Sequence, residues 1–274
     1  TLSAHVKREL KDQVVRMALG LKVVGLMNVQ FAIKKGEIFV LEVNPRASRT
    51  APFVSKATGV PLAYVAAKCM LGESLTDQGI RALKDPSYFS VKEAVFPFEK
   101  FPGVDPLLGP EMKSTGEVMG IGKSFGEAFG KAQQGAGMSL PKKGTVFVSV
   151  KDSDKADLVA LLGSLGEEYD IIATDGTALY LKQNGIICRR VNKVMQGQPH
   201  IVDAIKNGEI ALIINTTEGK RSNADSFSIR ASALAKKVAY TTTIAGATAA
   251  VMALTEMTST GIRPIQELHE GIFK

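Results

Sequence analysis

The chain has few of the features that mark secreted, membrane-spanning or nucleic-acid-binding proteins. Its 274 residues include only two cysteines, Cys69 and Cys188, too few and too isolated for a disulfide framework or a zinc site. There is no apolar run of roughly 18 residues and no signal-peptide pattern, so we expect neither membrane insertion nor secretion. Tryptophan is absent, and the excess of 34 basic over 27 acidic residues contains no run of about five basic side chains. We therefore expect a cytoplasmic protein that binds small anions, with no nucleic-acid and no membrane partner.

The sequence pattern changes near residue 137, which predicts two modest domains, each long enough to bury a core. A stretch containing glycine, proline and lysine at 135–144 is the best linker candidate. We place the boundary there, with domains over 1–137 and 138–274. In the first domain the pattern predicts helices over 2–19, 60–72 and 124–134, and extended segments and turns over 87–122.

Two apolar-patterned runs, 26–33 and 38–43, flank a Lys-Lys-Gly-Glu turn at 34–37, which predicts a β-hairpin. The odd-numbered residues of both runs are the bulkier ones. If both odd sets pack on one core, the register places odd residues opposite odd ones, and Gln30 opposite Glu42. The bulky residues on which this prediction depends are Val29, Phe31, Ile33, Phe39, Leu41 and Val43.

The even-numbered face of this hairpin gathers oxygen ligands. Gln30, Glu42 and Asn44 would lie close together there, and carboxylate and amide oxygens suit a hard divalent cation such as Mg²⁺. Arg46 and Arg49 follow directly, and guanidinium groups match phosphate or carboxylate bidentately. Metal and arginines together would hold a transferring phosphoryl group. The alternative is a surface hairpin with solvated charges.

Residues in and after the hairpin resemble the metal-binding end of the ATP-grasp fold, in the form found in the carbamoyl-phosphate synthetase large-subunit family. The resemblance implies an α+β domain end with a mainly antiparallel sheet, and a chain that is the C-terminal portion of a longer subunit. The matching segments are 30–32, 42–50, 52–62, 90–93, 100–112 and 114–120.

The same resemblance implies a set of roles. Gln30 and Glu42 would bind ATP through Mg²⁺ or Mn²⁺, with Asn44 as a third metal ligand and K⁺ as a further ion in the full enzyme. Arg46 and Arg49 would steady carbamate while it is phosphorylated. A glutaminase small subunit would be the partner, in a pathway to pyrimidines and arginine. Glu93 would help to bind the activator ornithine.

After the linker, strands alternate with helices, which predicts a parallel sheet with helices on both faces. Ligands of such sheets gather at the carboxyl ends of the strands, where polar loops occur at 174–177, 215–219 and 241–243. Hydroxyls, helix N-termini and nearby lysines there suit phosphate, although caps and turns are the commoner role of each residue. The predicted strands are 145–150, 171–173, 186–188, 210–214 and 238–240, and the predicted helices are 154–165, 178–184, 201–206, 223–237 and 244–254.

This half resembles the regulatory domain of the same family, whose Rossmann-like fold is shared with methylglyoxal synthase. Segments 191–194, 197–201, 205–209 and 213–217 carry the likeness. It implies an allosteric pocket for UMP, which inhibits, or IMP, which activates. The implied phosphate-pocket residues are Lys155, Thr174, Thr177, Lys193, Asn215, Thr217 and Ser226, with Asp225 at the ribose and Thr242 at ornithine.

Asp175 departs from the resembled pattern. Bacterial members carry histidine at this place, and a carboxylate beside a phosphate weakens anion binding. The identity of the effector is therefore left open.

Three functions stay open at this stage. The first is the portion of a carbamoyl-phosphate synthetase that supplies metal ligands and the allosteric domain, inactive on its own. The second is an isolated regulatory module that binds a nucleoside monophosphate, as a monomer or a homo-oligomer. The third, nucleic-acid binding, rests on net charge alone. An active methylglyoxal synthase is not favoured, because the expected aspartate and histidine surroundings are not evident.

Overall fold

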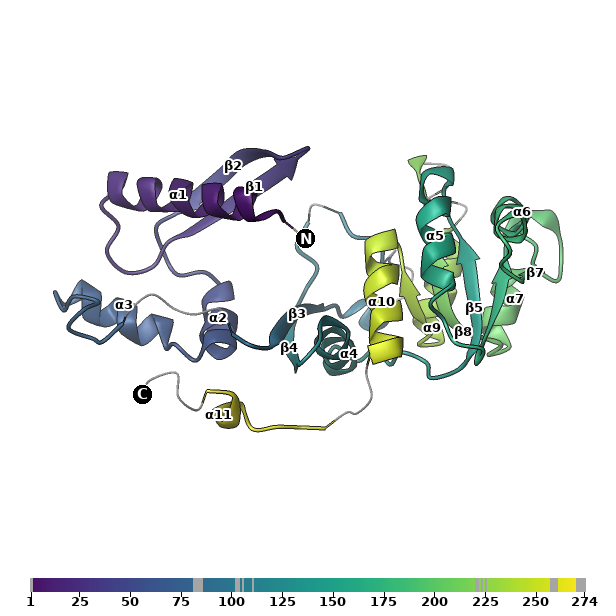
Figure 1. The fold of residues 1–274 in the computed structure, drawn as a ribbon. Coiled ribbons are helices and arrows are strands. Elements are labelled where there is room, and N and C mark those ends of the chain that lie inside the picture. The colour runs from purple at the N-terminus through teal and green to yellow at the C-terminus, as the bar shows by residue number, and fades with distance from the viewer. Residues whose placement is uncertain are drawn as a thin grey trace. The chain divides into compact units, whose positions relative to one another are not determined.

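The computed structural model describes residues 2–80, 86–101, 104, 106–109, 111–219, 222, 224, 226–256 and 261–269. The chain divides into two compact units (Figure 1): Thr1–Pro86 together with Ile262–Lys274, and Ser87–Gly261. Residues 87–137 thus fall in one compact unit with the C-terminal sheet. The compact units describe packing, whereas the boundary expected between residues 137 and 138 separates two family domains. That boundary therefore stays a prediction.

The first unit consists of a β-hairpin and short helices. The helix predicted over 2–19 is confirmed as α1 (Ala4–Gly20), and its N-cap is Ser3, whose Oγ accepts a hydrogen bond from the Val6 N–H at 3.3 Å. The helix predicted over 60–72 is confirmed as α3 (Leu62–Met70), with Pro61 at its N-cap. The remaining elements are β1 (Asn28–Lys34), β2 (Glu37–Asn44), α2 (Thr50–Thr58) and α11 (Ile265–Leu268).

The hairpin register is only partly as predicted. Gln30 lies opposite Glu42, as expected, but a β-bulge follows and Phe31 pairs with Val40, so the expected pairing of odd with odd residues is wrong beyond that point. The cause is the turn. Only Lys35–Gly36 connect the strands, and both have positive φ, 52° and 88°, as a tight type I′ connection requires. This turn offsets the register by one residue, and the bulge restores it before Gln30.

The bulge also changes which side chains share a face. Phe39 pairs with Ala32 and therefore lies on the same face as Gln30, instead of the bulky face predicted for it. Its side chain is 46% exposed and that of Leu41 is 63% exposed, so the predicted packing of both residues into one core is wrong for the described part of the chain. The oxygen-bearing end of the hairpin is not affected.

The second unit begins with the antiparallel strands β3 (Phe89–Val95) and β4 (Gly116–Gly122), covered by α4 (Phe125–Gly135). A Cβ atom on Gly120 would lie 2.0 Å from the Ala128 carbonyl oxygen, so this close approach of strand and helix requires glycine. The helix predicted over 124–134 is confirmed. Its N-cap is Ser124, whose Oγ accepts from the Glu127 N–H at 3.2 Å.

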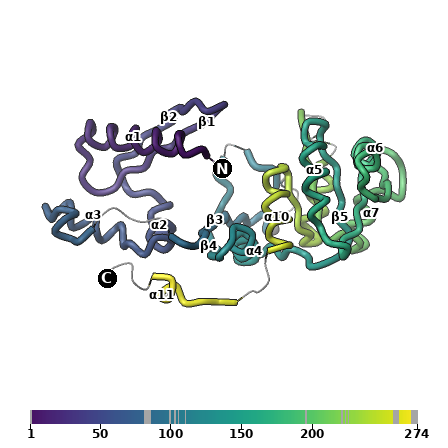
Figure 2. The backbone as a smooth tube through the Cα atoms, in the orientation of Figure 1, coloured from purple at the N-terminus to yellow at the C-terminus, as the bar shows by residue number. Residues whose placement is uncertain are grey.

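A five-stranded parallel sheet with its helices forms the rest of this unit, which confirms the predicted parallel α/β fold. The strand order is β7 (Arg189–Arg190), β6 (Tyr169–Ala173), β5 (Gly144–Ser149), β8 (Ile210–Asn215) and β9 (Ala239–Thr241). Side chains of β5 alternate between the two faces. Val146 and Val148 pack with α5 (Lys155–Leu162), α6 (Asp175–Gln183) and α10 (Ile244–Glu256), whereas Phe147 packs with α7 (Ile201–Lys206) and α9 (Phe227–Ala235). The tube in Figure 2 follows the chain from β4 through α4 into this sheet, where α4 also contacts α10.

The predicted elements of this sheet correspond to observed ones, but several differ in their bounds. The strand expected over 186–188 lies at 189–190, after the turn at Gly185. The helix expected over 178–184 already begins at Asp175, so residues 175–177, expected in a loop, belong to α6. The helix expected over 154–165 ends at Leu162, and the helix expected over 223–237 is described over Phe227–Ala235, with residues 223 and 225 outside the described residues. No helix in the described residues is both long and apolar enough to cross a bilayer. The elements are β5 (Gly144–Ser149), α5 (Lys155–Leu162), β6 (Tyr169–Ala173), α6 (Asp175–Gln183), β7 (Arg189–Arg190), α7 (Ile201–Lys206), β8 (Ile210–Asn215), α9 (Phe227–Ala235), β9 (Ala239–Thr241) and α10 (Ile244–Glu256), with 3₁₀ turns at Phe98–Lys100, Asp152–Asp154 and Val194–Gln196.

Candidate functional site

The first candidate site is the oxygen-bearing end of the hairpin. Gln30 faces Glu42 across the strands, and the Asn44 Nδ2 donates to Glu42 Oε1 at 2.9 Å. The described residues contain no group of three His, Cys, Asp or Glu side chains placed to hold a metal ion. One carboxylate with two amide groups fits only a hard cation that completes its shell with water and phosphate, as Mg²⁺ does. The hairpin therefore offers one side of such a site.

Arg46 and Arg49 follow the hairpin directly, as the sequence predicts. Arg46 is exposed, and its Nη1 donates to the Ala47 carbonyl oxygen at 3.1 Å. Arg49 is also exposed and stands at the N-cap of α2. Both arginines thus follow the oxygen-bearing end of β2 along the chain, and both are exposed.

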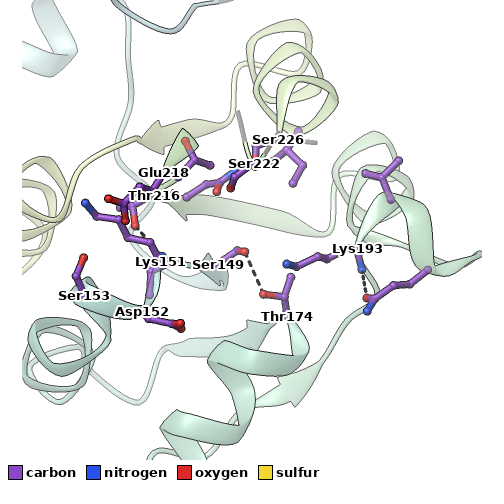
Figure 3. A pocket seen from close by; sticks show the side chains of 16 residues that line it. Ser149, Lys151, Asp152, Ser153, Thr174, Lys193, Thr216, Glu218, Ser222 and Ser226 are labelled. Carbon is purple, nitrogen blue, oxygen red and sulfur yellow. Dashed lines mark hydrogen bonds between the residues drawn. The ribbon is translucent and has the colours of Figure 1, made fainter. Parts of the chain in front are cut away.

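The second candidate site is a cavity of about 580 Å³ at the carboxyl ends of β5, β6 and β8. The chain runs from β5 to β6 and β7 on one side, and returns to β8 and β9 on the other. The cavity therefore lies where the strand order reverses, the usual ligand position in open α/β sheets. Its lining residues, ten of which are labelled in Figure 3, are Ser149, Val150, Lys151, Asp152, Ser153, Thr174, Lys193, Val194, Gln196, Asn215, Thr216, Thr217, Glu218, Ser222, Ser226 and Ile229.

Buried polar groups line the inner end of this cavity. Asn215 is only 3% exposed, and its Nδ2 has no hydrogen-bond partner among the described residues. The Thr174 hydroxyl donates to Ser149 Oγ at 3.0 Å (Figure 3). A buried donor without an acceptor is costly, so the Asn215 amide is suited to an acceptor oxygen from a ligand.

Charged side chains of both signs lie around the cavity. Lys151 and Lys193 line it together with Asp152 and Glu218. The Lys193 backbone N–H donates to Gln196 Oε1 at 2.7 Å, which closes the turn that carries this lysine (Figure 3). The opposite charges balance, so the cavity itself carries no strong net charge.

The structure brings together most of the pocket residues implied by the resemblance, but not all. Lys155 and Thr177 are not among the described lining residues. The Lys155 Nζ pairs with Asp152 Oδ1 at 2.7 Å, and Thr177 Oγ1 accepts from the Val150 N–H at 3.3 Å. Asp225 lies outside the described residues. The implied residues that line the cavity are Thr174, Lys193, Asn215, Thr217 and Ser226.

The two residues implied for ornithine lie on different elements of the second unit, Glu93 on β3 and Thr242 directly after β9. Glu93 lines a separate cavity of about 400 Å³ with Gln133 and Tyr240. Burial raises the pKa of the Glu93 carboxyl, and its hydrogen bond with Gln133 opposes that shift. Thr242 follows β9, two residues after Tyr240.

The loop after β5 is the part of the cavity that the sequence prediction missed. Ser149, Lys151, Asp152 and Ser153 all line the cavity. The sequence contained a signal for this loop. Ligands of such sheets gather at the carboxyl ends of the strands, and polar residues follow the central strand β5 as they follow the other strands. Position 175, flagged as a departure, carries a carboxylate that is not among the described lining residues.

Two family models match separate parts of the chain. Residues 1–78 match the carbamoyl-phosphate synthase L chain, ATP binding domain, and residues 155–242 match the MGS-like domain. The first match contains the hairpin site, and the second contains most of the residues that line the cavity.

Similar proteins in several bacteria carry the name carbamoyl phosphate synthase large chain. Those of Ralstonia nicotianae, Xanthomonas campestris pv. campestris and Pseudomonas aeruginosa are 58%, 55% and 55% identical to this chain, over 99% of it in each case. The matched regions cover 26%, 26% and 25% of those relatives, respectively. The chain thus spans about a quarter of the length of the curated relatives it matches.

Proposed function

We propose that this chain, which belongs to the carbamoyl phosphate synthase large-chain family, acts as the C-terminal portion of such a subunit. In this proposal its first part supplies one side of an ATP site, and its second part binds an allosteric effector. The match of the ATP-binding family to residues 1–78 and of the MGS-like family to residues 155–242 supports this division of roles.

The proposed role of the hairpin is to hold a divalent cation and the phosphates of ATP. Gln30, Glu42 and Asn44 would bind Mg²⁺ or Mn²⁺, with K⁺ as a further ion of the whole enzyme. The bound cation supplies charge neutralisation during phosphorylation of carbamate. Arg46 and Arg49 would orient carbamate and the transferred phosphoryl group. Catalysis would thus depend on position and electrostatics, since no side chain has to attack the substrate.

The proposed role of the cavity is to bind the phosphate of a nucleoside monophosphate, UMP as inhibitor or IMP as activator. One observation carries this proposal: the Nδ2 donor of buried Asn215 has no partner among the described residues and lies in the cavity that Thr174 and Lys193 also line, at the switch point of the sheet. A phosphate oxygen would satisfy the amide, and Thr217 and Ser226 would add hydroxyl donors. Lys155 would join them once its ammonium leaves Asp152.

The remaining proposals follow from the family. The partner would be the glutaminase small subunit, and the whole enzyme would serve pyrimidine and arginine formation in the cytoplasm. Ornithine would be a second effector, held by Glu93 and Thr242, and Asp225 would face the ribose of the nucleotide.

Calorimetry on the 274-residue chain tests the effector site. UMP or IMP should release heat on binding, and Thr217→Ala should weaken that binding because one hydroxyl contact to phosphate is lost. An absence of heat and of any thermal shift at millimolar nucleotide would reject the effector pocket.

A second candidate is a regulatory module that binds nucleotide but has no catalysis of its own. It is favoured by the cavity, because residues of the second unit alone line it. ATP turnover distinguishes the two candidates. The chain alone should not hydrolyse ATP in response to bicarbonate, and restoring the rest of the subunit should restore turnover only if the first proposal holds.

A further inference from the structure

Asp175 poses a problem for an anion-binding cavity. It is the first residue of α6 and directly follows Thr174, which lines the cavity. A free carboxylate at this place would repel a phosphate held by Thr174. The structure has to neutralise this charge if the cavity is to bind an anion.

Arg190, from strand β7, meets Asp175 with two nitrogen atoms. Its Nη2 donates to Asp175 Oδ2 at 2.7 Å, and its Nε contacts Asp175 Oδ1. The guanidinium group thus makes a two-pronged ion pair with the carboxylate, with a hydrogen bond to Oδ2 and an ionic contact with Oδ1. Both oxygen atoms of Asp175 are therefore engaged by one arginine, on a strand adjacent to the one that precedes Asp175.

Gln196 connects this ion pair to the cavity. Its Nε2 donates to Asp175 Oδ2 at 3.2 Å, and its Oε1 accepts the Lys193 backbone N–H at 2.7 Å. Both Gln196 and Lys193 line the cavity, and Lys193 is labelled in Figure 3. A continuous chain of hydrogen bonds thus runs from Arg190 through Asp175 and Gln196 to the turn that carries Lys193.

The ion pair contributes little to the free energy of folding, so its effect on anion binding in the cavity can be measured in folded variants. The side chains of Arg190 and Asp175 are 63% and 36% exposed, and pairs with this exposure stabilise a protein only weakly. Substitution of either residue should leave the fold intact. A change in anion binding would then report on charge and on the position of the turn.

We propose that Arg190 and Gln196 are positioning residues that neutralise Asp175 and hold the Lys193 turn at the cavity. In this arrangement Asp175 is an anchor for the turn and does not oppose the ligand. The inference rests on the proposed binding of a nucleoside monophosphate. It predicts that Arg190, a residue of β7 that is not among the described residues lining the cavity, affects the affinity for the effector.

The test is calorimetric binding of UMP and of inorganic phosphate to the 274-residue chain and its variants. Arg190→Met should weaken binding of both probes at least about threefold. The negative charge of Asp175 is then no longer compensated, and Asp175, to which Gln196 of the turn donates, is no longer held by Arg190. The loss should shrink in high salt, which screens charge. Arg190→Lys, which keeps the charge without the two-pronged geometry, should restore part of the affinity.

Two further variants distinguish the effect of the charge at Asp175 on binding from the effect of the net charge of the chain. Asp175→Asn combined with Arg190→Met should bind within about twofold of wild type, because the asparagine is neutral and its oxygen can still accept from Gln196. Arg189→Met is the matched control. It removes the same charge from the neighbouring residue of β7, and it should leave binding within about twofold of wild type.

The outcomes are distinguishable. Absence of binding to the wild-type chain overturns the proposed function and this inference with it. If the wild type binds, unchanged affinity in Arg190→Met overturns this inference alone. An equal loss in Arg189→Met, or no rescue in the double variant with an unchanged melting temperature, also overturns it.

Discussion

The hairpin site and the sheet cavity differ in how their residues are brought together. The hairpin collects Gln30, Glu42 and Asn44 within one short segment, on a face that stays largely exposed. The cavity collects residues from several strand ends, and those at its inner end are buried, with exposures of 2% for Thr174 and 3% for Asn215. A site encoded by neighbours in sequence is easy to recognise and can still be open. A site encoded by the fold is harder to recognise, but here it encloses its ligand-facing groups.

The comparison predicts that the hairpin needs further protein to act, whereas the cavity binds by itself. Hairpin variants should therefore be judged in the whole large subunit, and cavity variants in this chain. The predictions that follow run from the largest expected effect to the smallest.

The largest effect is expected for Glu42→Gln in the whole large subunit. Glu42 is the one carboxylate of the proposed metal site, and its neutralisation should lower carbamoyl phosphate formation by about 100-fold or more. Glu37→Gln is the matched control, because Glu37 lies at the other end of the same strand, beside the turn. Wild-type rates for Glu42→Gln would contradict the ligand role, and an equal loss in the control would point to damage to the hairpin.

A smaller effect is expected for Asn215→Ala, which should weaken UMP binding without lowering thermal stability. Binding of UMP should weaken by about tenfold, because a buried amide donor to phosphate is lost. Thermal stability should stay the same or rise, since the variant also removes a donor that has no partner among the described residues. Asn207→Ala, at the C-cap of α7, is the control for the loss of an asparagine. Equal UMP affinity in wild type and Asn215→Ala would contradict the cavity proposal.

The sequence predicted the sheet well and the hairpin register less well, for a physical reason. Strands of a parallel sheet are buried on both faces and read as apolar runs, so β8 was placed within one residue. The hairpin register depends on backbone torsions at Lys35 and Gly36, and a one-residue offset there moves Phe39 to the other face. Side-chain size alone does not encode that offset.

Within the cavity, the sequence predicted the positions of residues better than their partners. Thr174 follows the end of β6, Asn215 is the last residue of β8, and both line the cavity. The pair of Lys155 with Asp152 is local, because the two residues are three positions apart at the start of α5. The pair of Asp175 with Arg190 joins α6 to β7 and depends on where these two elements meet. Spacing along the chain does not predict which residues of two different elements come into contact. The sequence alone therefore did not show that Arg190 compensates the charge of Asp175.

A modest gain in affinity is expected for Asp152→Asn. In the structure Asp152 holds the ammonium of Lys155 at 2.7 Å, and this hydrogen bond lowers the pKa of the Asp152 carboxyl. Asparagine would free Lys155 for a phosphate and remove one negative charge from the cavity lining. UMP should then bind about threefold more tightly in calorimetry at low salt.

The control for this gain is Asp170→Asn, which changes the net charge equally but lies on β6 away from its carboxyl end. An identical gain in both variants would show that bulk charge causes it. No gain in Asp152→Asn would show that the Lys155 pair does not compete with the ligand.

The smallest effect concerns the pH dependence of stability at Glu93, in the second cavity. Burial raises the pKa of this carboxyl above its unfolded value, so the folded state binds its proton more tightly than the unfolded state does. Stability should therefore fall as pH rises from the unfolded pKa to the folded pKa, and the cost should stay constant at higher pH. Glu93→Gln should raise the melting temperature slightly at neutral pH, and the difference should vanish in acid. Glu117→Gln on the neighbouring strand, whose Oε1 pairs with Lys92 at 2.9 Å, should not raise it. A gain in Glu93→Gln that persists at the lowest pH would mean that charge burial is not its cause.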